Sequence, residues 1–185
     1  MIGYCLCGSF CTLERSEAVL SELVKSYNVM PIMSFNASST DTRFGKAEEH
    51  IKRITELCGR PPVVTIEDAE PLGPKIPLEA MVVAPCTGNT LAKMALGITD
   101  TPVTMAVKAH MRQSRPLLIA LATNDGMSAS LKNISTMLEK KSVYFVPMRQ
   151  DDVIKKPHSL VCEMEMIPTC LTDALNGKQK RPLFL

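Results

Sequence analysis

The chain has 185 residues, 45% of them hydrophobic and 22% charged, and these values predict one globular α/β domain over residues 1–185. The net charge of +2 and the scattered basic residues exclude a nucleic-acid binder, and an odd count of seven cysteines without a Cys-x-x-Cys pair indicates reduced thiols and no zinc site. No apolar run approaches the roughly 20 residues of a membrane span, and residues 1–11 lack a signal-peptide pattern, so we expect a cytoplasmic protein without a membrane partner.

The first predicted strand, residues 2–7, leads through a loop of small residues into a helix. Gly8 allows the backbone to approach a ligand closely, and Ser9 and Thr12 can either donate to a phosphate or cap the helix. The loop has neither the Gly-x-Gly-x-x-Gly spacing nor a Walker lysine, so it predicts no dinucleotide fingerprint and no P-loop. Helix capping alone is the simpler interpretation of this loop.

The second predicted strand, residues 28–34, ends in a polar run in which Ser34 could face a phosphate. A helix is expected over residues 44–58, with His50 among its solvated charges and with Gly59 and two prolines ending it. Residues 63–66 predict a short strand. The prolines of residues 67–78 predict a loop without regular structure, either as the rim of a pocket or as a surface crossover.

The next strand ends at Pro85, and a helix follows whose apolar face begins at Leu91. Thr87 or Asn89 can cap this helix, and an anion would be stabilised by its free amides and its dipole. An ordinary capped helix is the alternative.

The second half of the chain repeats the alternation. Residues 103–111 predict a helix, residues 116–122 a strand buried on both faces, residues 130–140 a helix and residues 143–147 a last strand. The small and polar segment 123–127 again follows a strand. Residues 151–165 are expected to form a loop, and residues 169–175 a short final helix.

Alternating strands and helices predict a doubly wound, mostly parallel sheet in a Rossmann-like or flavodoxin-like three-layer α/β/α arrangement. Ligands of such sheets bind at the carboxyl ends of the strands. Four segments with small or hydroxyl residues lie there, at 8–12, 34–42, 85–90 and 123–127. Their convergence predicts a ligand with one terminal phosphate, and the missing pyrophosphate fingerprint favours FMN over FAD or NAD.

The segment 84–100 resembles the Pro-Ala-Ser-Ala-Asn-Thr motif, with its Gly-Ile-x-Asp continuation, of the flavoproteins that include phosphopantothenoylcysteine decarboxylase and lantibiotic cysteine decarboxylases. Pro85, Asn89, Thr90, Gly97 and Asp100 match, while Cys86, Thr87 and Gly88 replace Ala, Ser and Ala. The family's flavin loop, phosphate serine and Asn-x-x-x-x-Leu pattern fall on residues 8–12, Ser34, and Asn133 with Leu138. The resemblance implies FMN bound by Gly8, Ser9, Phe10, Cys11, Thr12, Ser34, Pro85, Cys86, Thr87, Asn89, Thr90 and Asn124.

Within this family the whole chain most resembles a flavoprotein subunit that makes dipicolinate from a dihydrodipicolinate-level precursor in the mother cell of a sporulating bacterium. The resemblance implies a separate NAD(P)-binding A subunit as partner and a dicarboxylate substrate. Together with the 12 methionines, it also implies a homo-oligomer, a trimer or a multiple of it, with sites completed between protomers.

The sequence departs from the family at two places. No histidine stands in residues 73–77, where the cysteine decarboxylases carry a catalytic one, and the segment 122–127 lacks the proline of the family's Pro-x-Met-Asn pattern. These departures favour a redox subunit over a decarboxylase of a cysteinyl substrate, and a non-catalytic flavin-binding or assembly subunit remains the main alternative. Lys75, Arg43 and Lys108 are the basic residues nearest the loops in sequence, and each is either a substrate contact or a solvated charge.

Overall fold

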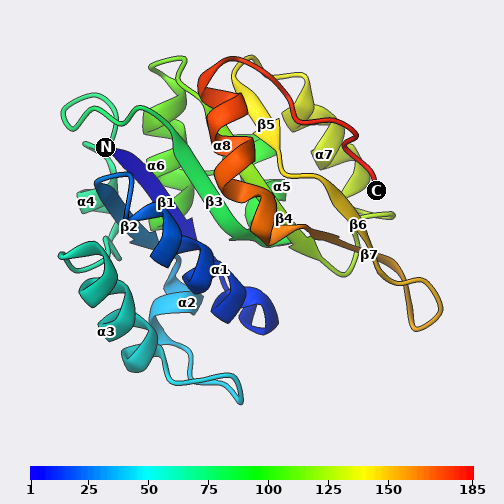
Figure 1. Ribbon diagram of the computed structural model, residues 1–185, viewed down its shortest axis with the longest axis horizontal. Helices are drawn as coiled ribbons and strands as arrows, with labels where there is room; N and C mark the ends of the chain where they lie inside the picture. The colour runs from blue at the N-terminus through cyan, green and yellow to red at the C-terminus, as the bar shows by residue number, and fades with distance from the viewer.

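A seven-stranded sheet forms the centre of the computed structural model, which describes residues 1–185 (Figure 1). The strand order is β2-β1-β3-β4-β7-β6, and β5 pairs with the first half of β4. The first five strands pair in parallel, and β7 is antiparallel to β4 and β6. The strands are β1 (Ile2–Leu6), β2 (Val29–Met33), β3 (Met81–Cys86), β4 (Leu117–Thr123), β5 (Val143–Phe145), β6 (Met148–Asp152) and β7 (Lys156–Cys162).

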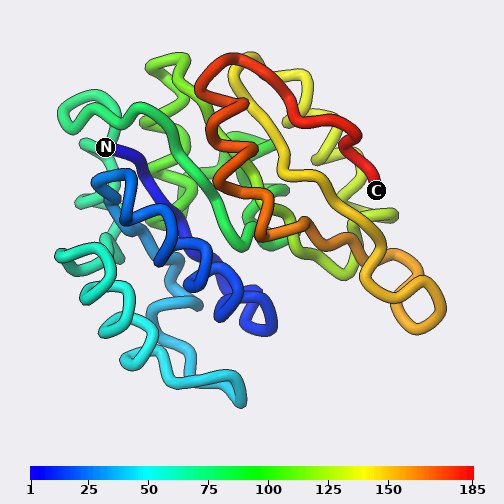
Figure 2. The backbone as a smooth tube through the Cα atoms, in the orientation of Figure 1, coloured from blue at the N-terminus to red at the C-terminus, as the bar shows by residue number.

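Helices cover both faces of the sheet, which confirms the predicted three layers (Figures 1 and 2). One face carries α1 (Phe10–Leu23) and α8 (Ile167–Leu175), which follows the short 3-10 helix η1 (Met164–Met166). The other face carries α5 (Gly88–Leu96), α6 (Pro102–Met111) and α7 (Leu131–Leu138). The chain moves from β1 to β2 in one direction and from β3 to β4 in the other. Right-handed crossovers therefore place α1 and α5 on opposite faces.

The remaining helices, α2 (Phe35–Ser39), α3 (Ala47–Cys58) and α4 (Ile66–Ala69), belong to the connection between β2 and β3. All residues of β1 and β3 are buried, as expected for parallel strands covered on both faces. Forty-five buried residues from all parts of the sheet and from helices of both layers form one hydrophobic cluster. No helix has the length and apolar character needed to cross a bilayer.

The prediction of a loop over residues 151–165 is wrong, because a β-hairpin and the start of a helical segment occupy it. Strand β5 has only three residues and covers β4 no further than Ile119, so the carboxyl half of β4 keeps a free edge. Strand β7 fills this edge through Ala122 and Thr123. The polar residues of β6 and of the first half of β7 are solvated in the projecting hairpin, so no alternation of apolar residues marks them as strands.

The connection between β2 and β3 also differs from the prediction. Residues 63–66 form no strand: Val63 makes a single bridge to Ile32, and Ile66 already begins α4, which Thr65 caps. The polar run after Ser34 contains the short helix α2. Helices α2 and α4 are too short for apolar residues to recur at helical spacing, so the sequence pattern does not reveal them.

His50 is buried, with 3% of its surface exposed, which contradicts the predicted solvated position. Its Nδ1 contacts the Glu17 carboxylate of α1, and Arg53 Nε donates to the same carboxylate at 2.9 Å. The residues of α3 that face the interior recur at helical spacing, and His50 falls between Ala47 and Ile54 on that face. The contact with Glu17 of α1 therefore compensates the burial of the polar His50 ring. The charged residues next to His50 in sequence do not indicate this contact.

Candidate cofactor site

Backbone hydrogen bonds join the carboxyl ends of the first three strands. The Ser34 amide, after β2, donates to the Leu6 carbonyl of β1 at 2.9 Å, and the Cys7 amide donates to the Pro85 carbonyl of β3 at 3.2 Å. Gly8 lies so close to the β2 loop that an added Cβ would stand 3.2 Å from Cβ of Asn36. The loops after β1, β2 and β3 are therefore neighbours at one edge of the sheet.

The loop after β4 meets the loop after β3 at Gly88, which is the first residue of α5. A Cβ added to Gly88 would lie 2.4 Å from Oγ1 of Thr123 and 2.8 Å from Oδ1 of Asp125. The Asp125 carboxylate accepts hydrogen bonds from Thr123 Oγ1 and from Ser130 Oγ, the latter at 3.0 Å. The predicted convergence of four loops at the carboxyl edge is thus present, and the lack of a side chain at residue 88 permits it.

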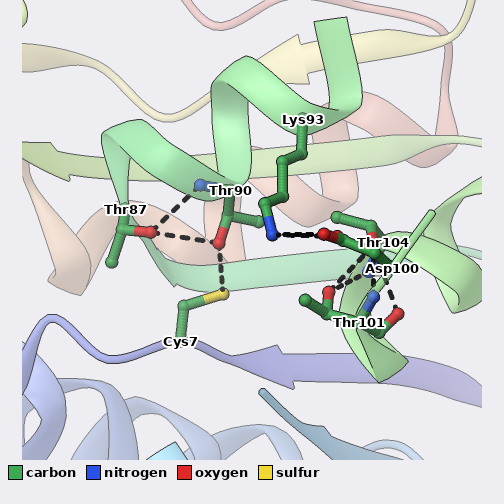
Figure 3. Close-up of polar contacts among 7 residues, drawn as sticks. All are labelled: Cys7, Thr87, Thr90, Lys93, Asp100, Thr101 and Thr104. Atoms are coloured by element: carbon green, nitrogen blue, oxygen red, sulfur yellow. Dashed lines mark hydrogen bonds and ion pairs between the residues drawn. The ribbon is translucent and has the colours of Figure 1, made fainter. Parts of the chain in front are cut away.

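Two of the predicted cofactor residues, Thr87 and Thr90, hold the loops together (Figure 3). Thr87 Oγ1 accepts from the Thr90 amide at 3.2 Å, which caps α5, and donates to Thr90 Oγ1 at 3.0 Å. Thr90 Oγ1 donates in turn to Sγ of Cys7 at 3.5 Å. Burial raises the pKa of the Cys7 thiol to about 11, so it stays protonated at neutral pH. This network ties β1 to the start of α5.

Pro85 and Cys86 are buried, so they shape the loop through their backbone. Burial raises the pKa of the Cys86 thiol well above its ordinary value. All seven cysteines are free thiols, as the odd count predicted, and only Cys11, at the start of α1, is exposed.

The side-chain amides of Asn89 and Asn124 are exposed at this edge and make no internal hydrogen bond, which leaves their donors and acceptors free. Ser9 precedes α1 without accepting a side-chain capping bond, and no acidic residue stands in the first turn. The first amides of this 14-residue helix therefore offer positive potential to an anion. Thr12 Oγ1 donates to the Ser9 carbonyl at 3.0 Å, and Ser34 Oγ caps α2 by accepting from the Ala37 amide at 3.3 Å.

Gly97 and Asp100, which match the family motif, have structural roles at the far end of α5. Gly97 ends the helix in the left-handed region, with φ of +74°, which favours glycine. Lys93 Nζ donates to the Asp100 carboxylate at 2.8 Å, and this bond lowers the pKa of Asp100 (Figure 3). Thr101 and Thr104 then form a capping box that starts α6. These residues therefore shape the chain between two helices.

Of the three basic residues nearest the loops in sequence, only Arg43 belongs to a connection at the carboxyl edge, where it packs over the Phe44 ring at 4.8 Å. Lys75 and Lys108 line a cavity of about 370 Å³ between α4 and α6. Residues 71–80 lead into the beginning of β3, which places Lys75 near the amino edge of the sheet. Both lysines therefore lie toward the edge of the sheet opposite to the four loops.

The sequence singled out neither Ser130 nor His158, and it indicated Asp125 only as a member of the polar segment 123–127. The hairpin brings in His158, which is exposed, and its carbonyl accepts from the Met127 amide at 2.9 Å. The short apolar run Leu160-Val161-Cys162 is the only local strand signal in this hairpin. Asp125 and Ser130 gave no comparable sign, because their roles depend on the absence of a side chain at Gly88.

Comparison with known proteins gives a consistent set of matches. The flavoprotein family model matches residues 1–173. The B subunit of dipicolinate synthase from Bacillus subtilis (strain 168) is 42% identical over 185 residues, which cover 100% of this chain and 92% of that protein. The crystal structure of the dipicolinate synthase B subunit from Bacillus halodurans superposes with a TM-score of 0.91 at 38% identity, covering 100% and 95% of the two chains.

A more distant structure shares the fold. DmrB of Burkholderia xenovorans, solved in complex with FMN and described as a cubic protein cage for redox transfer, has a TM-score of 0.70 at 18% identity. The match covers 95% of this chain and 94% of that one.

Proposed function

The chain belongs to the flavoprotein family, and we propose that it is the FMN-binding B subunit of a dipicolinate synthase. In this proposal it forms dipicolinate from a dihydrodipicolinate-level precursor, together with an NAD(P)-binding A subunit, in the cytoplasm of the mother cell of a sporulating bacterium. The observation that carries the proposal is the convergence of four loops with neutral hydrogen-bonding groups at one edge of the sheet. The full-length likeness to two dipicolinate synthase B subunits supports it.

The donor set at the carboxyl edge fits FMN. A phosphate monoester needs donors without nearby carboxylates, and the uncapped first turn of α1 offers amides beside the hydroxyl of Ser9. The Thr12 hydroxyl donates to Ser9 and so fixes this turn. A flavin ring needs neutral donors and acceptors at its polar edge, and the free amides of Asn89 and Asn124 provide both. The residues proposed to hold the cofactor are Gly8, Ser9, Phe10, Cys11, Thr12, Ser34, Pro85, Cys86, Thr87, Asn89, Thr90 and Asn124.

The contributions of these residues differ. Thr87 and Thr90 fix the loop, because their hydroxyls are already used inside the protein. Asn89 and Asn124 orient the cofactor through amides that have no other partner. Gly8 lets the loop after β1 lie against the loop after β2.

Dipicolinate formation from a dihydro precursor removes two electrons and two protons from the ring, and bound FMN would supply the two-electron acceptor. The chain itself must hold a dicarboxylate against that acceptor. Arg43 can make a bidentate bond to a carboxylate from the connection between α2 and α3. Arg43 is therefore the proposed partner of a substrate carboxylate.

The main alternative is a non-catalytic role, in which the chain binds flavin and supports the A subunit without oxidising the heterocycle. The two roles differ in what the purified chain does alone. If the chain is the oxidoreductase, its flavin absorbance bleaches when chemically prepared dihydrodipicolinate is added without oxygen and without the A subunit. If the chain serves assembly, bleaching requires the A subunit.

The test has two steps. Mass spectrometry of the ligand released from the purified protein, or from protein reconstituted with flavin, is expected to identify FMN; a dinucleotide, or no binding after reconstitution, refutes the cofactor assignment. Anaerobic addition of dihydrodipicolinate then separates the two roles. Dihydrodipicolinate that leaves the flavin oxidised with and without the A subunit refutes the proposed reaction.

A further inference from the structure

A second cavity lies between α5, α6 and the end of α7, away from the cofactor loops. Its volume is about 290 Å³, close to the lower end of small-ligand pockets in proteins. Apolar side chains of Met94, Val107 and Met111 line it together with three cationic groups, those of Lys108, Arg112 and Lys140.

The three cations have no anionic partner. Lys108, Arg112 and Lys140 take part in no ion pair, and no aspartate or glutamate lines this cavity. Lys93, the residue before Met94 on α5, is by contrast paired with the Asp100 carboxylate at 2.8 Å. Lys108 and Arg112 also border the neighbouring cavity of about 370 Å³, where Glu67 and Glu70 lie, without forming an ion pair with either.

The position of the cavity separates it from the proposed FMN site. Arg112 directly follows α6 and precedes the beginning of β4, and Lys140 precedes the beginning of β5. Both cations therefore approach the amino ends of parallel strands, whereas the cofactor loops follow the carboxyl ends of β1 to β4. Helix α5 connects the two regions, with Thr87 at its start and Met94 near its end.

We propose that this cavity binds a small carboxylate with an apolar ring or chain. The cations would pair with the carboxylate group, and guanidinium and ammonium groups form strong charge-assisted hydrogen bonds to such a group. The methionine and valine side chains would cover the apolar part of the ligand, and methionine adapts well to the shape of a ring. The assignment does not depend on the proposed function, because no cofactor residue lines the cavity.

The test titrates the full FMN-loaded chain with isophthalate, a rigid benzene dicarboxylate, and observes carbon-13-labelled methionine methyl groups by NMR. Met94 and Met111 line the cavity, so their methyl signals are expected to shift and saturate. Met33, at the end of β2, is fully buried and serves as the internal control, because its signal should not move. If the chain proves to hold no FMN, the proposed function fails, and the same titration of the flavin-free chain still tests the cavity.

Matched variants identify the charged groups. K108Q, R112Q and K140Q are each expected to weaken isophthalate binding about tenfold or more, since each removes a charge-assisted hydrogen bond. K132Q removes an exposed lysine of α7 that does not line the cavity, and it is expected to leave the affinity unchanged. All four positions lie at the surface or in the cavity wall, and thermal unfolding checks that each variant folds as the parent does.

Five results would overturn the proposal. The first four are the absence of saturable shifts at millimolar isophthalate, equal weakening in K132Q, equal affinity for the neutral isophthalamide, and equal competition by sulfate. The third would show that the carboxylate is not recognised, and the fourth that the apolar wall contributes nothing. In the fifth result, isophthalate binding is lost only under conditions in which light scattering shows that the chains associate. This result would assign the cavity to contact between copies of the chain and would contradict a small-molecule site.

Discussion

Thr87 and Asn89 lie two residues apart in the same loop and have different tasks. The Thr87 hydroxyl is occupied by the helix cap and by Thr90, whereas the Asn89 amide faces outward with no partner. By the family motif alone, both residues would be equivalent cofactor contacts. The structure separates the residue that stabilises the loop from the residue that is free to bind a ligand.

Substitution of these two residues therefore gives opposite signatures. T87A is expected to lower the free energy of unfolding by about 0.5 to 2 kcal/mol, because α5 loses its cap, and T87S should restore it. N89A is expected to leave the unfolding free energy unchanged and to weaken FMN binding about 5-fold to 100-fold, since a polar edge of the flavin loses its partner.

Urea unfolding and flavin fluorescence titration measure the two effects separately. The separation of roles is wrong if N89A destabilises the chain as much as T87A does, or if N89A binds FMN like the parent.

Gly88 stands where the resembling family has alanine, and the structure explains the difference. The space of the alanine methyl group is taken by Thr123 and Asp125, at 2.4 and 2.8 Å from an ideal Cβ. The positions of Thr123 and Asp125 in the loop after β4 therefore require that residue 88, in the loop after β3, has no side chain.

A double-mutant cycle tests this pairing. G88A is expected to cost about 1 to 3 kcal/mol of stability by overpacking, and to weaken FMN binding because two cofactor loops are pushed apart. T123A removes the oxygen nearest the new methyl group, so G88A in the T123A background should cost less. A coupling energy of about 0.5 kcal/mol or more is expected from urea unfolding, and strict additivity would contradict direct contact.

At the level of the elements, α6 contains a buried histidine that should make stability depend on pH. His110 is fully buried, and Nε2 lies 2.9 Å from the Pro116 carbonyl, which requires the tautomer with the proton on Nε2. Burial lowers the pKa of His110, because the charged form is poorly solvated. The native chain therefore holds His110 neutral at a pH where the unfolded chain protonates it.

The sign of the pH effect follows from this difference. Below the unfolded pKa of about 6.5 the unfolded state binds more protons, so stability falls as the pH is lowered, by at most about 1.4 kcal/mol per pH unit from this group. Urea unfolding between pH 7.5 and 5 measures the slope. H110Q, which keeps a donor for Pro116, is expected to reduce the slope, and the exposed-site control H158Q is expected to keep it. Equal slopes in H110Q and the parent would refute this assignment.

For the whole molecule, one hydrophobic cluster reaches from β1 to α8, and we propose that residues 1–185 form one domain. Apolar side chains are nevertheless exposed, among them Ile154 at the hairpin tip, 87% exposed, and Leu96 at the end of α5, 72% exposed. Single exposed apolar side chains are common on monomeric proteins, so the expectation of an oligomer rests on the family resemblance.

We expect the chain to be a homo-oligomer, a trimer or a multiple of it, with its cofactor site completed by a neighbouring protomer. Light scattering at micromolar concentration should give three times the chain mass of 20.3 kDa, or a multiple of that value. I154E, placed at the projecting hairpin tip, is a surface change that tests whether this tip contributes to the assembly. A monomer of the parent chain would contradict the prediction.

Residue order alone determined the parallel sheet and the four loops at its carboxyl edge. Alternating apolar segments specify strands and helices locally, and right-handed crossovers leave few ways to connect them. The tertiary structure decided which loop side chains are free and which are engaged, because Thr87, Asp125 and His50 find partners that are distant in sequence or that only a folded loop brings close. It also decided that Lys75 and Lys108 lie near the amino edge, and that a hairpin completes β4. These outcomes depend on packing between segments far apart in the chain, which no local pattern encodes.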